Sequence, residues 1–103
     1  MAGEQTGLNQ LKLTACLIAK DVIRYTPAGQ PVMNCQLKYQ GQVFEAGSSR
    51  KVEMNILAIA IGPVYRSIET MELGQVANYE GFIAHKSLRS PALVFHITNI
   101  FFN

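Results

Sequence analysis

Alternating apolar and polar positions mark most of this chain as β-strand. The clearest run lies between Met33 and Tyr39, where every second side chain is apolar or aromatic and those between them are Asn, Gln and Lys. A period of two residues is typical of a strand with one buried face. The same pattern predicts five strands in all: Leu11–Ala19, Met33–Tyr39, Lys51–Ile61, Gln75–His85 and Leu93–Phe101.

One short helix interrupts the strands. Apolar residues recur at helical spacing between Pro63 and Gly74, two residues that favour a helix start and a helix end. The order β-β-β-α-β-β is that of the five-stranded oligonucleotide-binding (OB) barrel. A small all-β sandwich is the competing layout, but it usually needs about seven strands. We therefore expect an all-β OB-fold domain over residues 8–103, with the helix between strands three and four, behind a flexible arm at residues 1–7.

The connections between the predicted strands are read from turn-forming residues. Tyr25–Pro31, with two Pro and one Gly, predicts a loop, and Gly41–Ser49 predicts a flexible connection longer than a tight turn. Lys86–Pro91 predicts a short basic loop. Leu57–Ile61 is apolar at every position, so we expect this half-strand to be covered on both sides. Gly81, inside the fourth strand, indicates either sharp curvature or a close approach of another backbone.

Composition limits the class of protein. The 103 residues leave room for one domain, and 49% hydrophobic against 16% charged residues exclude a disordered chain. The net charge of +2 is no histone-like excess. Many aliphatic residues on so small a chain predict apolar surface that a partner subunit covers, so we expect an oligomer. The start of the chain lacks the charged residues of a secretory signal, and no apolar run reaches ~18 residues, so we expect a cytoplasmic protein with no membrane contact.

Residues for catalysis or metal binding do not gather in the sequence. The two histidines, His85 and His96, fall on different predicted strands, and we expect a structural or surface role for each. Cys16 and Cys35 lie in apolar stretches and predict buried free thiols. The serines fall in predicted loops or on the helix, where nothing marks one as activated, and no glycine-rich phosphate loop is present. We expect no enzyme, no catalytic residue, no cofactor and no metal.

Cations beside aromatic or small polar residues recur where strands run into loops. Single-stranded nucleic acid needs this mixture, because cations compensate phosphates while aromatic rings stack on bases. The candidate binding residues are Arg24, Tyr25, Lys38, Phe44, Arg50, Lys51, Lys86 and Arg89. The same cations could merely keep loops solvated, and an OB module that docks a protein partner with only weak nucleic-acid binding is the alternative. Phe82 should point outward from its strand, where we expect it to form a subunit contact.

Three segments together resemble one family. Ile23–Val32, Glu80–Ser90 and the closing Ile97–Ile100 are similar to the primosomal replication protein N (PriB) family, relatives of the bacterial single-stranded DNA-binding proteins. The resemblance covers about residues 8–100. It implies an OB-fold homodimer without catalytic activity that binds single-stranded DNA with little sequence preference. It also implies contacts with the primosomal helicase and other primosome proteins, in support of reloading the replicative helicase at stalled forks.

The resemblance also implies site residues. The family's basic residues in the last loop correspond to Lys86 and Arg89, and those flanking the second loop to Arg50 and Lys51. The chain departs from some relatives at Ser48 and Glu53, which stand where those relatives have aromatic residues. A carboxylate at Glu53 would repel phosphate, which predicts weaker or differently routed DNA binding. The docking alternative therefore stays open beside single-stranded DNA binding.

Overall fold

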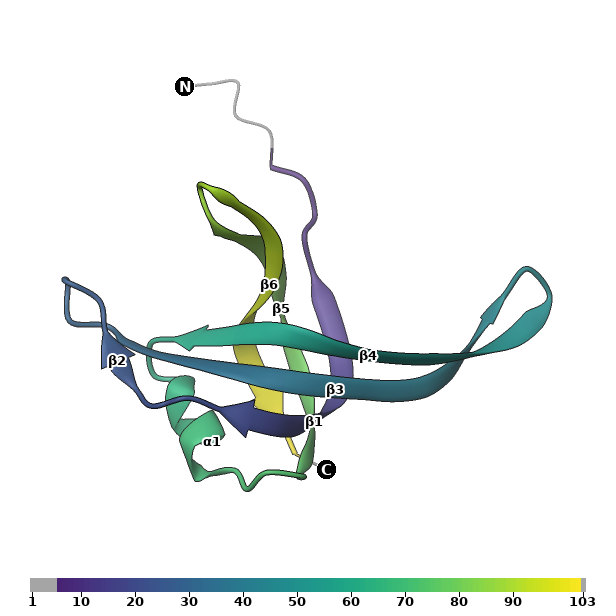
Figure 1. Ribbon diagram of the computed structural model, residues 1–103, viewed down its shortest axis with the longest axis horizontal. Coiled ribbons are helices and arrows are strands. Elements are labelled where there is room, and N and C mark those ends of the chain that lie inside the picture. The colour runs from purple at the N-terminus through teal and green to yellow at the C-terminus, as the bar shows by residue number, and fades with distance from the viewer. Residues whose placement is uncertain (1–5, 103) are drawn as a thin grey trace.

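Five strands close into a mixed β-barrel in the computed structural model, which describes residues 6–102 (Figure 1). The elements in chain order are β1 (Leu11–Lys20), β2 (Arg24–Tyr25), β3 (Pro31–Glu45), β4 (Ser48–Ile61), α1 (Tyr65–Thr70), β5 (Val76–Ser87) and β6 (Ser90–Phe101). The predicted OB arrangement is confirmed, with the helix between the third and fourth barrel strands. Of the arm predicted at residues 1–7, residues 1–5 lie outside the described residues.

The barrel closes because β1 changes partner along its length. Its first half, Leu11–Cys16, pairs antiparallel with β5, and its second half pairs antiparallel with β3. A bulge between Leu17 and Ala19 marks the change, and bulges bend a strand in this way. The remaining order is β5-β6-β4-β3, with β4 and β6 parallel and the other neighbours antiparallel.

The core fills the barrel with the inward side chains of every barrel strand. Leu17, Leu37, Tyr79 and Phe95 are fully buried. Burial also raises the pKa of the Cys35 thiol to about 12, so this cysteine stays protonated and unreactive at neutral pH. The prediction of free cysteines is confirmed, although Cys16 is only half-buried.

Helix α1 lies against one end of the barrel, and a lysine from β1 fixes its C-terminus. Ile68 of the helix is fully buried. The ammonium of Lys20 donates to the carbonyl oxygens of Met71 at 2.5 Å, Glu69 at 2.8 Å and Ile68 at 3.5 Å. The last carbonyls of a helix lack partners inside it and carry partial negative charge, so a cation there is stabilising. No helix in residues 6–102 is long and apolar enough to cross a membrane.

Removing this ammonium should lower stability measurably. We expect Lys20→Met, which keeps the aliphatic stem, to cost about 1 kcal/mol of unfolding free energy, because three carbonyls lose their charged donor. Urea unfolding followed by circular dichroism measures the change. The matched control is Lys12→Met, whose exposed ion pair with Glu80 spans 3.8 Å and should contribute under about 0.5 kcal/mol. Equal midpoints for both variants would contradict this role for Lys20.

The prediction of a flexible connection longer than a tight turn at Gly41–Ser49 is wrong. β3 and β4 stay paired as far as Glu45 and Ser48, and only Ala46 and Gly47 form the turn, with φ of 53° and 80°. Both residues have a left-handed backbone conformation, as the common two-residue hairpin turn requires. The hairpin projects beyond the barrel as an arm (Figure 1). Both faces of this arm are exposed to solvent, so both carry polar residues. These polar residues resemble those of a loop, which is why the sequence suggested one.

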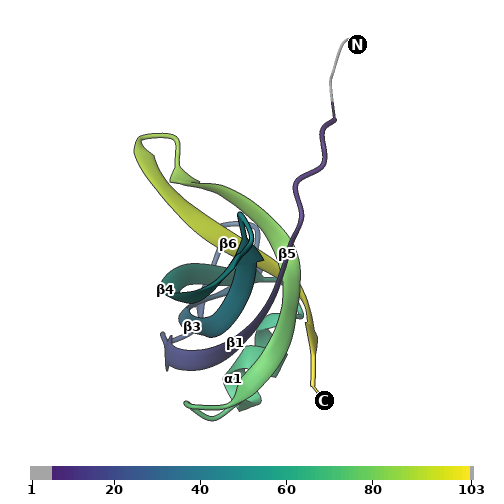
Figure 2. The ribbon, with the colours of Figure 1, turned by 90° about the vertical axis from the view of Figure 1, so that its right-hand side faces the viewer.

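The two other predicted loops are also shorter than expected. β5 and β6 pair up to Ser87 and Ser90, so the turn is Leu88–Arg89 and most of the segment Lys86–Pro91 is strand (Figure 2). In the first connection, β2 pairs with the start of β3, with Tyr25 opposite Pro31. Proline has no N–H to donate, which is why it suits the first residue of a strand as well as a loop.

Candidate nucleic-acid interface

One side of the sheet, outside the barrel core, carries a row of side chains across four strands. Phe82 on β5 is opposite His96 on β6, His96 is beside Ile59 on β4, and Ile59 is opposite Asn34 on β3. Side chains alternate along a strand, and the next residue after Ile59 is the fully buried Ala60. The row therefore faces away from the core.

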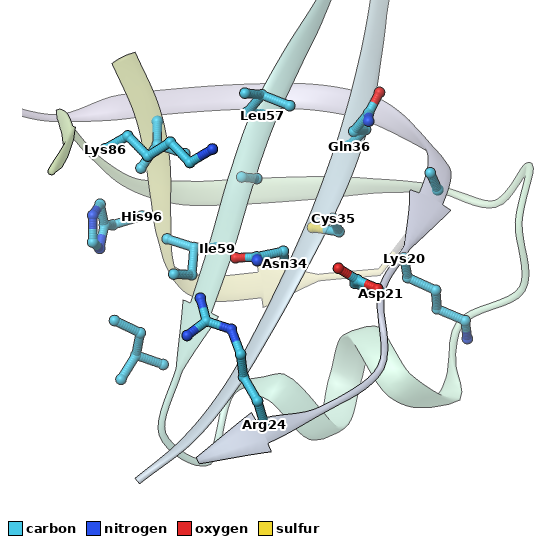
Figure 3. A pocket seen from close by; sticks show the side chains of 14 residues that line it. Lys20, Asp21, Arg24, Asn34, Cys35, Gln36, Leu57, Ile59, Lys86 and His96 are labelled. Carbon is cyan, nitrogen blue, oxygen red and sulfur yellow. The ribbon is translucent and has the colours of Figure 1, made fainter. Parts of the chain in front are cut away.

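This side of the sheet is hollowed into a pocket of about 550 Å³, which we call the groove (Figure 3). Such a volume is within the range of ~300–1,000 Å³ typical of pockets for small-molecule ligands. Its floor comes from β3, β4 and β6, and its sides from the β1–β3 connection and from β5. The lining residues that matter below are Asp21, Arg24, Asn34, Gln36, Leu57, Ile59, Ile61, Lys86 and His96.

The aliphatic part of the floor corrects the expectation for Leu57–Ile61. Ala58 and Ala60 face the core, but Leu57 and Ile61 are 42% and 44% exposed. This half-strand is therefore covered on one side only. Its other face is open because it lies in the groove, and an apolar strand pattern does not distinguish a covered face from a ligand-facing one.

Two predicted cations flank the groove from different elements. Arg24 on β2 and Lys86 on β5 both line it, and their charged ends point toward the floor (Figure 3). Within residues 6–102 neither one makes an ion pair. Lys20 also lines the groove, but its ammonium is engaged at the end of α1. Asp21 adds one carboxylate, so the groove is only mildly positive.

The groove side continues along the β3–β4 arm. Lys38 is opposite Asn55, and Phe44 is opposite Ser49, in the same alternation as Asn34 and Ile59. Lys51, opposite Gln42, shares this side, and Phe44 is 78% exposed near the turn. Three predicted binding residues, Lys38, Phe44 and Lys51, therefore line one face that leads into the groove.

The other three predicted residues are placed differently. Arg50 is on the opposite side of the arm and pairs with Glu45 at 3.0 Å. Tyr25 is exposed on β2, and Arg89 is in the β5–β6 turn, and neither lines the groove. The two departures from the family pattern also lie on the arm: Ser48 begins β4, and the exposed Glu53 accepts a hydrogen bond from Gln40 at 2.5 Å.

Sequence reasoning missed His96 as a site residue. Its ring lines the groove and stacks on Phe82, with 4.7 Å between ring centroids and 8° between ring planes. Burial lowers the pKa of His96, which keeps the imidazole neutral at pH 7. Phe82 points outward as predicted and is 37% exposed. The sequence does hold one signal for this pair. Phe82 and His96 both point outward, and they become cross-strand neighbours once β5 and β6 are aligned as a tight hairpin.

The groove is built for binding. Within the described part of the chain, no three His, Cys, Asp or Glu side chains lie together as a metal site needs. The groove combines the cations Arg24 and Lys86, the carboxylate of Asp21, amides at Asn34 and Gln36, aliphatic residues and the ring of His96, which stacks on Phe82 behind it. Such a surface can hold a flexible anionic chain that also carries apolar groups.

Comparison with known proteins agrees with this reading. The family model described as "Another single-strand binding protein family" matches residues 9–99. The replication restart protein PriB of Neisseria gonorrhoeae is 39% identical over 97 residues, covering 91% of this chain and 94% of that protein. PriB of Bordetella pertussis is 32% identical over 90 residues, covering 87% and 84%. The chain belongs to the PriB family of replication restart proteins.

A solved PriB structure supports the assignment. PriB from Ralstonia solanacearum is 41% identical, with a TM-score of 0.86, over 91% of this chain and 96% of that one. The family resemblance found in the sequence is therefore confirmed over nearly the whole domain.

Proposed function

We propose that this chain binds single-stranded DNA in the groove as an accessory protein of replication restart. The observation that carries the proposal is the position of the groove. OB barrels bind oligonucleotides on the face of their second and third strands, between the first and last connections. Here that face is β3 and β4; Arg24 reaches it from β2 in the first connection, and Lys86 reaches it from the end of β5, next to the last connection.

The composition of the groove supports DNA over a small charged ligand. Arg24 and Lys86 can compensate phosphates, while Leu57, Ile59 and the ring of His96 offer apolar surface to bases. The face along the arm, with Lys38, Lys51 and Phe44, extends the path of a strand beyond the groove. No base-reading pattern is required for this mode of binding, which fits little sequence preference.

The salt dependence of binding tests this proposal. We expect a labelled oligo-dT to bind in fluorescence anisotropy, with the affinity falling as salt rises. The slope of log K against log salt should be about −1.4 if only Arg24 and Lys86 engage phosphates, and about −2.8 if Lys38 and Lys51 join them. Absence of binding even at low salt would contradict the proposal and favour the docking module.

The docking alternative has two observations in its favour. Leu57 and Ile61 expose aliphatic surface on the groove floor, and Asp21 reduces its positive charge. An apolar peptide of a helicase could use such a floor. A pull-down with the primosomal helicase, in the presence and absence of oligo-dT, would show whether partner and DNA compete for the groove.

We further propose that the protein acts as a homodimer and contacts the primosomal helicase and other primosome proteins. The first half of β1 pairs with β5 on one side only, which leaves an edge that a second copy could extend. Phe82 lies beside the groove residue His96, so the subunit contact expected at Phe82 and DNA binding at this place would exclude each other. A role in restart places the protein in the cytoplasm.

A further inference from the structure

The stacked rings at the β5 side of the groove have no role in the packing of the barrel core. We propose that Phe82 and His96 form the nucleobase-stacking platform of the groove, with His96 receiving the base and Phe82 holding its ring. This inference rests on single-stranded DNA binding as the proposed function. It deepens that function by naming where a base, rather than a phosphate, is bound.

The geometry of the pair favours a base as its ligand. The rings stand on neighbouring strands, almost parallel, with their centroids 4.7 Å apart. His96 lines the groove, whereas Phe82 lies behind it on β5 and is not part of the lining. A planar base entering the groove can therefore continue the stack on His96, while the ring of Phe82 limits the rotation of the imidazole.

Different residues of the groove are suited to contact the base and the phosphates. Among the described residues that line the groove, His96 is the only aromatic one. Lys86 lies above it on the same side of the groove, and Arg24 reaches the floor from below (Figure 3). Burial lowers the pKa of His96, so the neutral ring offers a stacking surface while the two cations offer charge.

The platform is tested by removing the His96 ring and measuring the affinity of the variant for two kinds of oligonucleotide. We expect His96→Leu, which keeps apolar volume but removes the ring, to weaken binding of oligo-dT by about 5- to 150-fold, the range for one lost base stack. Binding of an abasic oligonucleotide of the same length should change less than about twofold, because its phosphates remain. The salt slope should also stay the same, since no cation is removed.

Phe82 is tested as the positioning residue. Phe82→Leu should weaken binding of oligo-dT by about fivefold and leave abasic binding unchanged, and Phe82→Tyr should restore the affinity for oligo-dT. His96→Phe should retain most of the affinity, since it keeps an aromatic ring at the same place. If His96→Leu does not fold, as judged by circular dichroism, Phe82→Leu carries the test alone because its site is partly exposed.

Three results would overturn the platform. The first is unchanged affinity for oligo-dT in both Leu variants, and the second is an equal loss on the abasic oligonucleotide. The third is a fall in oligomer mass by light scattering in Phe82→Leu, which would make Phe82 a subunit contact. Failure of the unmodified protein to bind either oligonucleotide would instead overturn the proposed function, so the two failures are distinguishable.

Discussion

Replacing Gly81 by alanine should destabilise the barrel by about 3 kcal/mol or more. Gly81 lies at a register shift in the antiparallel pairing of β5 with β6. A Cβ added there would overlap the carbonyl oxygen of His96 and come within 2.9 Å of a ring atom of Phe95. The first obstacle is backbone and the second is a fully buried side chain, so neither can move away cheaply. Such a loss is a large part of the ~5–15 kcal/mol typical of a domain.

Urea unfolding of Gly81→Ala, followed by circular dichroism, measures this effect. Gly7→Ala is the matched control, because a Cβ added at Gly7 meets no atom within 4 Å and should leave the midpoint nearly unchanged. A stable Gly81→Ala variant would mean that β5 and β6 can move apart at this register shift. The same separation would displace His96, so any folded Gly81→Ala protein should also lose part of its affinity for single-stranded DNA.

The barrel could be predicted from the sequence because each of its strands has one buried face. Met33, Cys35 and Leu37 alternate with polar residues and are all buried in the core. The ends of the hairpins could not be predicted in this way. Beyond the barrel the arms expose both faces, alternation disappears, and the turn Ala46–Gly47 lacks the Asn-Gly pair that usually marks a tight hairpin.

The groove could be predicted only in part for a related reason. Arg24 and Lys86 could be predicted as binding residues because they lie near strand ends, where OB connections meet the binding face. The floor residues Ile59 and His96 look like ordinary outward or core positions until the register places them in one row. The pairing of strands far apart in sequence determines which outward residues meet, and periodicity within one strand carries no information on that pairing.

Reversing the two cations of the groove should nearly abolish binding of single-stranded DNA. In Arg24→Glu combined with Lys86→Glu, two phosphate contacts become two repulsions beside the carboxylate of Asp21. We expect the affinity for oligo-dT to fall on the order of 100-fold at low salt, from about 1–2 kcal/mol per reversed charge near the surface. The neutral pair Arg24→Gln and Lys86→Gln should reduce the salt slope by about 1.4.

Two single reversals show whether the effect belongs to the groove. Arg66→Glu on α1 makes half the charge change of the double variant at a residue that does not line the groove, and Arg89→Glu makes the same half change in the β5–β6 turn. Both should weaken binding only a few-fold, through the net charge of the protein. Equal losses in all variants would mean that the strand follows the general field of the protein rather than the groove. Unchanged binding in the double variant would leave the groove free for a protein partner, and retention of the primosomal helicase by that variant would then identify this chain as a docking module.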